Sequence, residues 1–369
     1  MLRVLMILGG PMYYGGTELF LMNYYRHINR NEIQFDFVCP GDEHGVFDDE
    51  ITKMGGRIFH VPHKLKHPVK YTLGLKKIIL DNGYKIIHSQ MNAMGCWPLA
   101  IAKSVGVPMR IAHSHSTKHQ TSNSVKFILN DIAKLLLRKY ATDYYACGYD
   151  AGVFLFGKKL MVQNKVQIIH NAIELDKYAY SDSKRNKIRK EFGIKDEIVI
   201  GHVGQFHEWK NHKKIIEIFT EIAKADSNVK LMLVGDGPLK SDIQTMAKKN
   251  NIRDKVIFTG SRDDVSDILN AFDVFLFPSL FEGLGIVAIE SQANGLPTVV
   301  SDAVPDEALI TDIVIKEALE SDACIWKDTL YKALKAGRKN ENEKLIEAGY
   351  DIVTEAIKLE ERYVKSQKN

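Results

Sequence analysis

Short apolar runs alternate with longer amphipathic stretches along the first 170 or so residues of the chain. The apolar run Leu2–Leu8 is followed by a glycine-rich turn and then by a helical pattern from about Thr17 to Ile28. Further strand-like runs, each separated from the next by enough residues for a helix, are Phe35–Cys39, Arg57–Val61, Lys85–His88, Arg110–His113 and Tyr144–Ala146. This alternation predicts a parallel sheet covered by helices on both faces.

The alternation breaks at a polar connector near residues 170–178 and then starts again. The strand-like runs of the second series are Ile198–Val203, Val229–Val234, Val256–Phe258, Val274–Phe277 and Thr298–Val300. A last helical pattern covers Ile352–Val364. The sequence therefore predicts an α/β protein with two doubly wound domains, residues 1–172 and 173–350. Residues 351–369 are expected to form a C-terminal helix that crosses back to the first domain.

The composition is that of a soluble globular protein. Of the 369 residues, 45% are hydrophobic and 26% are charged. No apolar run reaches the roughly 18 residues that a membrane-spanning helix requires. The apolar N-terminal run meets a glycine turn without a small-residue cleavage pattern, which predicts a buried strand rather than a signal peptide. The four cysteines are scattered, without the spacing of a zinc site or a disulfide framework, and this favours a reducing, cytoplasmic location.

The charge is unevenly distributed, although the net charge is only +4. The first 172 residues contain 21 Lys and Arg against 12 Asp and Glu, and the segment from Lys53 to Lys139 contains 15 against two. Such a segment is either a solvated basic face or a surface for an anionic partner, namely a membrane, a pyrophosphate-bearing substrate or nucleic acid. Nucleic acid is the weakest of these interpretations, because the segment contains no recognised binding module.

A helical pattern inside this basic segment, Ser124–Tyr145, combines apolar positions with four cations. An ordinary packed helix accounts for the pattern, and a helix that lies on an anionic membrane is the alternative. The apolar positions are Phe127, Ile128, Ile132, Leu135 and Leu136, and the cations are Lys126, Lys134, Arg138 and Lys139.

Ligands of doubly wound sheets bind at the carboxyl ends of the strands, so the residues there are candidate site residues. In the first domain Gly15 and Gly16 stand just before a helix, where free amides favour a phosphate, although a structural turn explains both glycines equally well. His113 and His115 follow the fifth strand at alternate positions and share a face if the strand continues. They are either core or solvated histidines or, as we favour, ligand-binding residues. No third residue with suitable spacing completes a metal site.

The second domain places cations and glycines at its strand ends. Lys210, in GHVGQFHEWKNH, stands just before a predicted helix, and a lysine beside a helix N-terminus suits a diphosphate. Gly260 and Arg262, in FTGSRDDV, offer backbone groups and a cation to a nucleobase and its phosphates.

Two glutamates stand eight positions apart in the stretch FEGLGIVAIE. Glu282 lies in a turn after a strand, and Glu290 lies two turns into a helix that Gly283 and Gly285 open. Amides at a helix start suit a phosphate or a sugar oxygen, and the two carboxylates can accept hydrogen bonds from hydroxyls on either side of a diphosphate. Two incidental surface glutamates are the alternative interpretation.

These residues resemble the retaining glycosyltransferases of family 4, which have the GT-B fold of two Rossmann-like domains facing a central cleft. The resemblance covers essentially the whole chain, is densest between Val199 and Asp302, and has the spaced glutamates as its most specific element. The stretches GGTELFLMNYYRHI, RIAHSHST and VGQFHEWKNH add to it. The stretches PSLFEGL and ESQANGLPTVVSD are similar to the corresponding stretches of bacterial exopolysaccharide and capsule enzymes of the EpsF type.

The resemblance implies that residues 1–172 bind an acceptor and residues 173–350 a nucleotide sugar, expected to be UDP-linked, without a metal ion or another cofactor. It implies that Lys210 holds the diphosphate, Glu282 contacts the donor sugar and Glu290 the ribose. The family histidine near the transferred sugar falls on His115 or His113, and we favour His115. The catalytic residues expected are His115, Lys210 and Glu282. The donor-binding residues expected are Gly15, Gly16, His113, Gln205, Gly260, Arg262, Gly283, Leu284, Gly285, Ile286 and Glu290.

The chain departs from the family at Gln205, where the family usually has an arginine that acts with the lysine on the leaving nucleoside diphosphate. The loss of one cation predicts weaker stabilisation of the leaving group, unless Arg262 compensates. The implied mechanism retains the anomeric configuration through front-face departure, with closure of the two domains about the connector at residues 170–178.

The implied acceptor is a glycan or a polyprenyl-pyrophosphate-linked oligosaccharide of a surface polysaccharide, reached in the cytoplasm or on the inner face of the cell membrane. A nucleotide-sugar 2-epimerase has the same architecture, but it needs acid–base carboxylates in the first domain, and the sequence does not reveal any. A non-catalytic nucleotide-sugar-binding subunit is the other alternative, and Gln205 is the residue that favours it.

Overall fold

The computed structural model describes residues 1–117 and 124–365, and the side chains of these residues except those of 124–128. The chain divides into two compact units. The first unit consists of Met1–Ala172 together with the C-terminal segment from Ile352, and the second unit consists of Ile173–Asp351. Each unit contains one parallel sheet with helices on both faces, so the α/β class and the doubly wound architecture predicted from the sequence are confirmed.

The sheet of the first unit has seven strands in the order β3-β2-β1-β4-β5-β6-β7, and the paired strands all run parallel. Because β1 lies in the middle, the chain builds the sheet outward to one side and then to the other. The strands are β1 (Leu2–Ile7), β2 (Ile33–Pro40), β3 (Ile58–Val61), β4 (Ile86–Ser89), β5 (Met109–Ser114), β6 (Asp143–Ala146) and β7 (Val166–Ile168).

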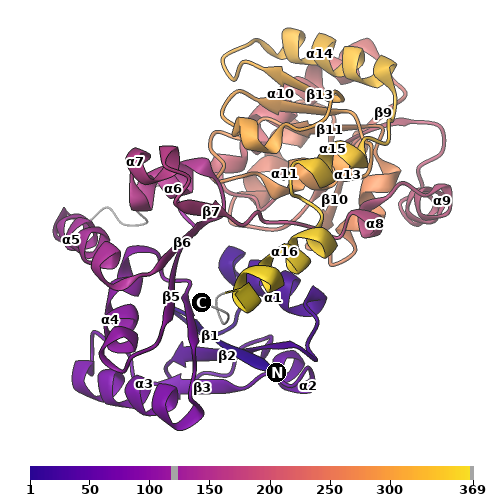
Figure 1. Cartoon of the computed structure of the whole chain (residues 1–369). Coiled ribbons are helices and arrows are strands. Elements are labelled where there is room, and N and C mark those ends of the chain that lie inside the picture. The colour runs from indigo at the N-terminus through magenta and orange to yellow at the C-terminus, as the bar shows by residue number, and fades with distance from the viewer. Residues whose placement is uncertain (118–123, 366–369) are drawn as a thin grey trace. The chain divides into compact units, whose positions relative to one another are not determined.

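Helices cover both faces of this sheet (Figure 1). One face packs against α1 (Gly16–His27), α2 (Asp48–Lys53) and α16 (Ile352–Lys365), and α16 lies beside α1. The helices whose apolar side chains pack on the other face are α3 (Pro68–Asn82), α4 (Cys96–Ser104), α5 (Ser124–Tyr140), α6 (Tyr149–Phe156) and α7 (Lys158–Val162). The last helix of the chain thus belongs to the first unit, through the buried side chains Ile352, Ala356, Leu359 and Tyr363.

The sheet of the second unit has six parallel strands in the order β10-β9-β8-β11-β12-β13. The strands are β8 (Ile198–Val203), β9 (Val229–Val234), β10 (Val256–Gly260), β11 (Val274–Phe277), β12 (Thr298–Ser301) and β13 (Val314–Glu317). One face packs against α10 (His212–Ala225), α11 (Lys240–Lys249) and α14 (Ala323–Ala336). The other face packs against α8 (Leu175–Tyr178), α9 (Asp182–Glu191), α12 (Val265–Ile268), α13 (Ile286–Ala293) and α15 (Asn342–Glu347).

Helix α5 differs from its sequence prediction in two ways. It ends at Tyr140, because Asp143–Ala146 pairs with β5 as strand β6. Its described apolar side chains also divide between two faces. Ala133 and Leu137 are buried in the core, whereas a second set is exposed, namely Leu129, Ile132, Leu135 and Leu136. Ordinary packing therefore accounts for Ala133 and Leu137 but not for Ile132, Leu135 and Leu136, and the side chains of Lys126, Phe127 and Ile128 lie outside the described residues.

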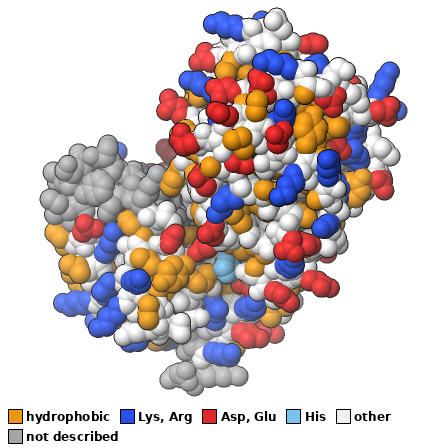
Figure 2. Space-filling model, turned by 90° about the horizontal axis from the view of Figure 1, so that it is seen from above, with side chains coloured by type: hydrophobic (Ala, Val, Ile, Leu, Met, Phe, Trp, Pro, Cys, Tyr) orange, Lys and Arg blue, Asp and Glu red, His pale blue; other side chains and the backbone are white. Residues whose placement is uncertain are grey.

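The surface charges do not form a single broad patch on the face shown in Figure 2. On the described residues of this face, acidic and basic side chains are intermixed over most of the area. The surplus of cations between Lys53 and Lys139 therefore does not appear as one basic area on this face.

Candidate active site

The N-terminus of α1, which follows β1, presents free backbone amides. Gly15 caps the helix without a side-chain hydrogen bond, and Gly16 is exposed, with open space where a side chain would begin. No acceptor among the described residues is paired with the amides of Gly16 or Thr17. A side chain at position 15 would collide with the Glu18 carboxylate, at 2.2 Å from Oε2. The glycine pair therefore leaves the amides of Gly16 and Thr17 open beside the Glu18 carboxylate, and a phosphate contact here stays a prediction.

Three histidines stack at the carboxyl ends of β4 and β5. The rings of His88 and His113 are 5.1 Å apart, and those of His113 and His115 are 4.1 Å apart. His88 Nε2 lies 3.0 Å from His113 Nδ1, and His88 Nδ1 lies 2.7 Å from the Tyr363 hydroxyl of α16. His113 is completely buried, so in this structure it cannot make the direct contact with a nucleotide sugar that was expected of it. It packs against the ring of His115 instead.

His115 is the member of the stack that reaches the surface. Its Nε2 lies 2.7 Å from Gln90 Oε1, and because a carbonyl oxygen only accepts, His115 donates from Nε2 and is left with Nδ1 as an acceptor. Its backbone amide donates to Asn92 Oδ1 at 2.7 Å. Burial lowers the pKa of His115 to about 3, so the ring is neutral near pH 7. A neutral, oriented imidazole can accept a hydrogen bond from a hydroxyl.

Lys210 and Glu282 form an ion pair in the second unit. Lys210 Nζ donates to Glu282 Oε1 at 2.7 Å, with side-chain exposures of only 15% and 10%. The ammonium also lies 4.6 Å from the centre of the Phe277 ring at the end of β11. The sequence places these two residues 72 positions apart, and the sheet brings them together because β8 and β11 are neighbouring strands.

The turn between Glu282 and α13 presents backbone donors. Gly285 caps the helix in the left-handed conformation, with φ of 81°, and its position against the Phe277 ring leaves little room for a side chain. Gly283 has open space around it. No acceptor among the described residues is paired with the amides of Gly283, Leu284 or Ile286. These amides and Lys210 make one positively polarised region at the start of α13.

Glu290 lies inside α13 and accepts a hydrogen bond of 2.8 Å from the Tyr178 hydroxyl of α8. Burial raises the pKa of Glu290 to about 7, against the opposing effects of the Tyr178 hydrogen bond and of the charges on Lys177 and Lys210. A carboxyl group held this way, two turns below the free amides, can accept hydrogen bonds from a polyol such as a ribose.

The other predicted residues of the second unit have different surroundings. The Gln205 side chain is exposed. Gly260 is left-handed at the end of β10 and lies against Gly235, whose amide donates to its carbonyl at 2.9 Å. Arg262 donates to both oxygens of Asp264, at 2.8 and 2.7 Å, and to Glu191 at 2.9 Å. The Arg262 guanidinium is therefore already paired with two carboxylates, which does not support the idea that it compensates for Gln205.

Four partner residues were not predicted from the sequence, namely Gln90, Asn92, Tyr178 and Tyr363. Gln90 follows β4, so its position at a strand end was a usable signal. Tyr178 lies in the connector and Tyr363 near the end of the chain, and nothing in the local pattern links them to Glu290 or His88. Only tertiary packing brings these side chains together.

Two absences hold for the described part of the chain. Within residues 1–117 and 124–365, no cluster of three or more His, Cys, Asp or Glu side chains is arranged to hold a metal ion. Over the same residues, every helix is too short or too polar to cross a membrane.

Comparison with known proteins agrees with the two-unit architecture. The model of the family described as "Glycosyltransferase Family 4" matches residues 14–177, and that of "Glycosyl transferases group 1" matches residues 184–351. The "Putative glycosyltransferase EpsF" of Bacillus subtilis is 34% identical over 361 residues, which are 95% of this chain and 93% of that protein. The chain therefore belongs to the GT-B glycosyltransferases with these two domains.

Within this family the similarity extends to a protein named for its activity and to solved structures. The UDP-Gal:alpha-D-GlcNAc-diphosphoundecaprenol alpha-1,3-galactosyltransferase of Escherichia coli is 27% identical over 90% of this chain and 89% of its own length. The structure of Anabaena HepE in complex with UDP superposes with a TM-score of 0.78 at 17% identity, over 99% of this chain and 100% of that one. Family membership favours a transferase over the epimerase and over a non-catalytic subunit.

Proposed function

We propose that this protein is a retaining, metal-independent glycosyltransferase that moves a sugar from a UDP-sugar to a glycan or lipid-linked acceptor of a surface polysaccharide. The observation that carries the proposal is the Lys210–Glu282 ion pair at the open start of α13, with Glu290 two turns below it. A nucleotide sugar has a ribose, a diphosphate and a sugar in sequence, and the site has a carboxyl group, a positive region and a second carboxylate in the same order.

The positive region is suited to the leaving group. Charge develops on the diphosphate as the bond to the sugar breaks, and Lys210 with the free amides of Gly283, Leu284 and Ile286 would stabilise it. The proposal that no metal ion is needed rests on this cation and these donors. Gln205 contributes no charge, which makes Lys210 the principal cation of the proposed site.

Retention follows if departure and attack occur on one face of the sugar. The bond from the sugar C1 to the β-phosphate oxygen breaks with its electron pair on the phosphate. The acceptor hydroxyl oxygen forms the new bond to C1 from the same face, and its proton passes to the leaving phosphate, so that UDP is the second product. No protein nucleophile is required, and Glu282 would orient the sugar hydroxyls.

His115 is proposed to position the transferred sugar. Its ring is fixed by Gln90 and by the stack with His113, and Nδ1 remains as an acceptor for a sugar hydroxyl. Because the ring is neutral near pH 7, it would bind a hydroxyl without repelling a cationic neighbour.

The activity for which the Escherichia coli relative is named supports a lipid-linked acceptor, and α5 supports the membrane surface as the place of reaction. Its exposed apolar side chains are Leu129, Ile132, Leu135 and Leu136. Two cations beside them are already engaged within the unit: Lys134 with Asp131 and the Phe154 ring, and Arg138 with the Phe156 carbonyl. The apolar stripe, more than the basic charge, would therefore attach α5 to a bilayer.

Attachment is tested by co-sedimentation with neutral and anionic vesicles. Replacing Leu129 and Leu135 by Gln should reduce binding to both kinds, whereas replacing Lys126, Lys134, Arg138 and Lys139 by Gln should reduce only the salt-sensitive part, on the order of 1 kcal/mol per cation. A protein that remains in the supernatant with every vesicle at low salt would remove the membrane from the proposal.

The activity is tested by incubation with a panel of UDP-sugars, with and without acceptors, in the presence of a chelator. The proposal predicts UDP release that depends on one sugar and on the acceptor and that the chelator leaves unchanged. NMR of the product should show the anomeric configuration of the donor. Isomerised sugar with donor alone would indicate an epimerase, and UDP binding without turnover would indicate a binding subunit.

A further inference from the structure

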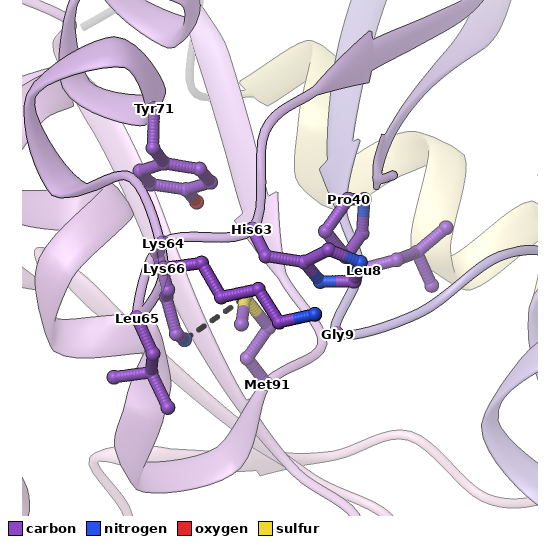
Figure 3. Close-up of a pocket in the computed structure, with 9 residues that line it drawn as sticks. All are labelled: Leu8, Gly9, Pro40, His63, Lys64, Leu65, Lys66, Tyr71 and Met91. Carbon is purple, nitrogen blue, oxygen red and sulfur yellow. Dashed lines mark hydrogen bonds between the residues drawn. The ribbon is translucent and has the colours of Figure 1, made fainter. Parts of the chain in front are cut away.

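A cavity of about 230 Å³ opens in the first unit at the carboxyl ends of β1, β2 and β4. Figure 3 shows its walls. Leu8, Pro40 and Met91 supply apolar surface from the three strand ends, and Tyr71 closes another side from the first turn of α3. The loop between β3 and α3 contributes His63, Lys64 and Lys66. The cavity thus combines apolar walls with two lysines and contains no acidic lining residue.

Lys64 is a half-buried ammonium without a counter-charge. Its Nζ donates to the Met94 carbonyl at 3.3 Å and lies 4.0 Å from Met91 Sδ, and no carboxylate among the described residues pairs with it. Burial lowers the pKa of Lys64 to about 8. An ammonium has three donors, so at least one N–H of Lys64 is left for a ligand. Burying this charge without a counter-ion destabilises the folded protein, and an anion bound in the cavity would offset that cost.

Tyr71 is the second feature that indicates a ligand. Its side chain is 2% exposed, and its hydroxyl has no hydrogen-bond partner within residues 1–117 and 124–365. The ring is held edge to face against Trp97, with centroids 6.2 Å apart. In Figure 3 the hydroxyl points toward the lysine side chains. Buried hydroxyls are normally paired, so this one indicates a polar ligand atom inside the cavity.

Charge and shape together define the chemistry of the ligand. Two lysines and a hydroxyl donor match an oxyanion that accepts several hydrogen bonds, and they would repel a metal ion. A neutral sugar would find no carboxylate here of the kind that Glu282 and Glu290 offer in the second unit. The apolar walls match a carrier with hydrocarbon beside its anionic group. The lining residue Leu65 is itself exposed, as are Val69 and Leu73 of the adjoining helix α3.

We propose that this cavity is the subsite for the phosphate group of the acceptor, with Lys64, Lys66 and the Tyr71 hydroxyl as its ligands. The inference rests on the proposed function, since it names the acceptor as a phosphorylated amphiphile. The phosphate could belong to a lipid carrier or to a soluble phosphorylated sugar, and the two sources share the same oxyanion chemistry. Neither the donor residues of the second unit nor His115 takes part in this subsite.

The test is calorimetric titration of the full chain with farnesyl diphosphate, inorganic diphosphate and farnesol, each in the presence of saturating UDP. Lys64→Met keeps the apolar stem without the charge, Tyr71→Phe removes only the hydroxyl, and Lys77→Met on the exposed side of α3 is the matched control. Farnesyl diphosphate should bind the wild type and lose about tenfold or more in Lys64→Met. It should lose several-fold in Tyr71→Phe and nothing in Lys77→Met.

Two further readouts separate the outcomes. Anion binding should restore the proton on Lys64, so proton uptake near pH 8 should appear in buffers of different ionisation enthalpy and vanish in Lys64→Met. Inorganic diphosphate that binds equally well, with the same Lys64 dependence, assigns the subsite to a soluble phosphate. Equal affinity for farnesol, or equal loss in Lys77→Met, overturns the subsite. Absent farnesyl diphosphate binding overturns it while UDP binding still supports the donor site, whereas absent UDP binding contradicts the proposed function itself.

Discussion

The side chains at the strand ends of the two sheets differ in whether they have partners within their own unit. In the second unit each charged candidate residue already has a partner of the same unit: Lys210 has Glu282, and Glu290 has Tyr178. In the first unit Lys64 is held only by a carbonyl and a sulfur, and the Tyr71 hydroxyl has no partner among the described residues.

This difference bears on how each unit would take up an anion. An anion entering the first unit would gain new contacts without breaking an existing one. On the proposed function, a diphosphate entering the second unit would replace Glu282 as the partner of Lys210 and release that carboxylate for sugar hydroxyls. We infer that the second unit selects ligands that carry both a diphosphate and a sugar. Only such a ligand offers a new partner to Lys210 and to Glu282 at the same time.

The largest effect is expected from removing the principal cation of the second unit. Lys210→Ala should reduce turnover by about 100-fold or more, since one lost donor to a developing anion costs on the order of 3 kcal/mol. Steady-state UDP release measures this, and Lys213→Ala, an exposed lysine of α10, is the matched control. Comparable turnover in the two variants would show that the diphosphate is stabilised elsewhere.

Glu290→Ala should weaken UDP binding by roughly 1–3 kcal/mol, because a hydrogen bond between the ribose and this buried carboxyl group is lost. Glu290→Gln retains an acceptor for Tyr178 and should lose less. Calorimetry with both folded variants measures the difference. Unchanged UDP affinity in Glu290→Ala would refute the assignment of this residue to the ribose.

Gln205→Arg adds to the second unit a cation without a carboxylate partner, as Lys64 is in the first unit. Turnover should be preserved or rise by a few-fold, because a second cation would meet the charge that develops on the diphosphate. The measurement is UDP release at saturating donor. A variant that loses donor affinity would show that the site is built around glutamine.

The smallest expected effect is a difference between the wild type and Glu290→Gln in how Tm depends on pH. The fold raises the pKa of Glu290 from 4.5 to about 7, so its protonated form is favoured in the native state. The stability contribution is complete below the unfolded pKa and is lost as pH rises through about 7. Between pH 5 and 8, Tm should therefore fall more in the wild type than in Glu290→Gln. The buried histidines change stability in the opposite direction and are common to both proteins, so an identical Tm profile would contradict the raised pKa.

The regular part of this fold could be predicted from the sequence because its strands are continuous apolar runs buried on both faces. β8, β9 and β11 have the bounds that the pattern gives. β7 and β13 were missed because they are short edge strands with half-exposed, mixed residues, which resemble loops. The sequence left open whether the apolar residues of α5 pack in the core, because an apolar residue has the same appearance in a sequence whether or not something covers it.

The candidate site could be predicted as far as strand ends and glycine turns allow. Lys210, Glu282 and Glu290 were found because each follows a strand or a glycine-opened helix start. Their pairing was not predicted, since hydrogen bonds between residues 72 and 112 positions apart depend on the register of the sheet. The Lys64 subsite was missed for a related reason: a lysine in a basic loop gives no sign that its ammonium is half buried.

The exchange of Lys210 from Glu282 to a diphosphate is the central claim, and a calorimetric comparison of the wild type with Glu282→Gln tests it most directly. UDP and the UDP-sugar selected by the donor panel are titrated into both proteins. Because the variant frees Lys210 but cannot bind sugar hydroxyls as a carboxylate, it should bind UDP at least as tightly as the wild type. It should also lose the extra affinity for the UDP-sugar over UDP. Weaker UDP binding in Glu282→Gln, with the preference for the UDP-sugar intact, would contradict the account.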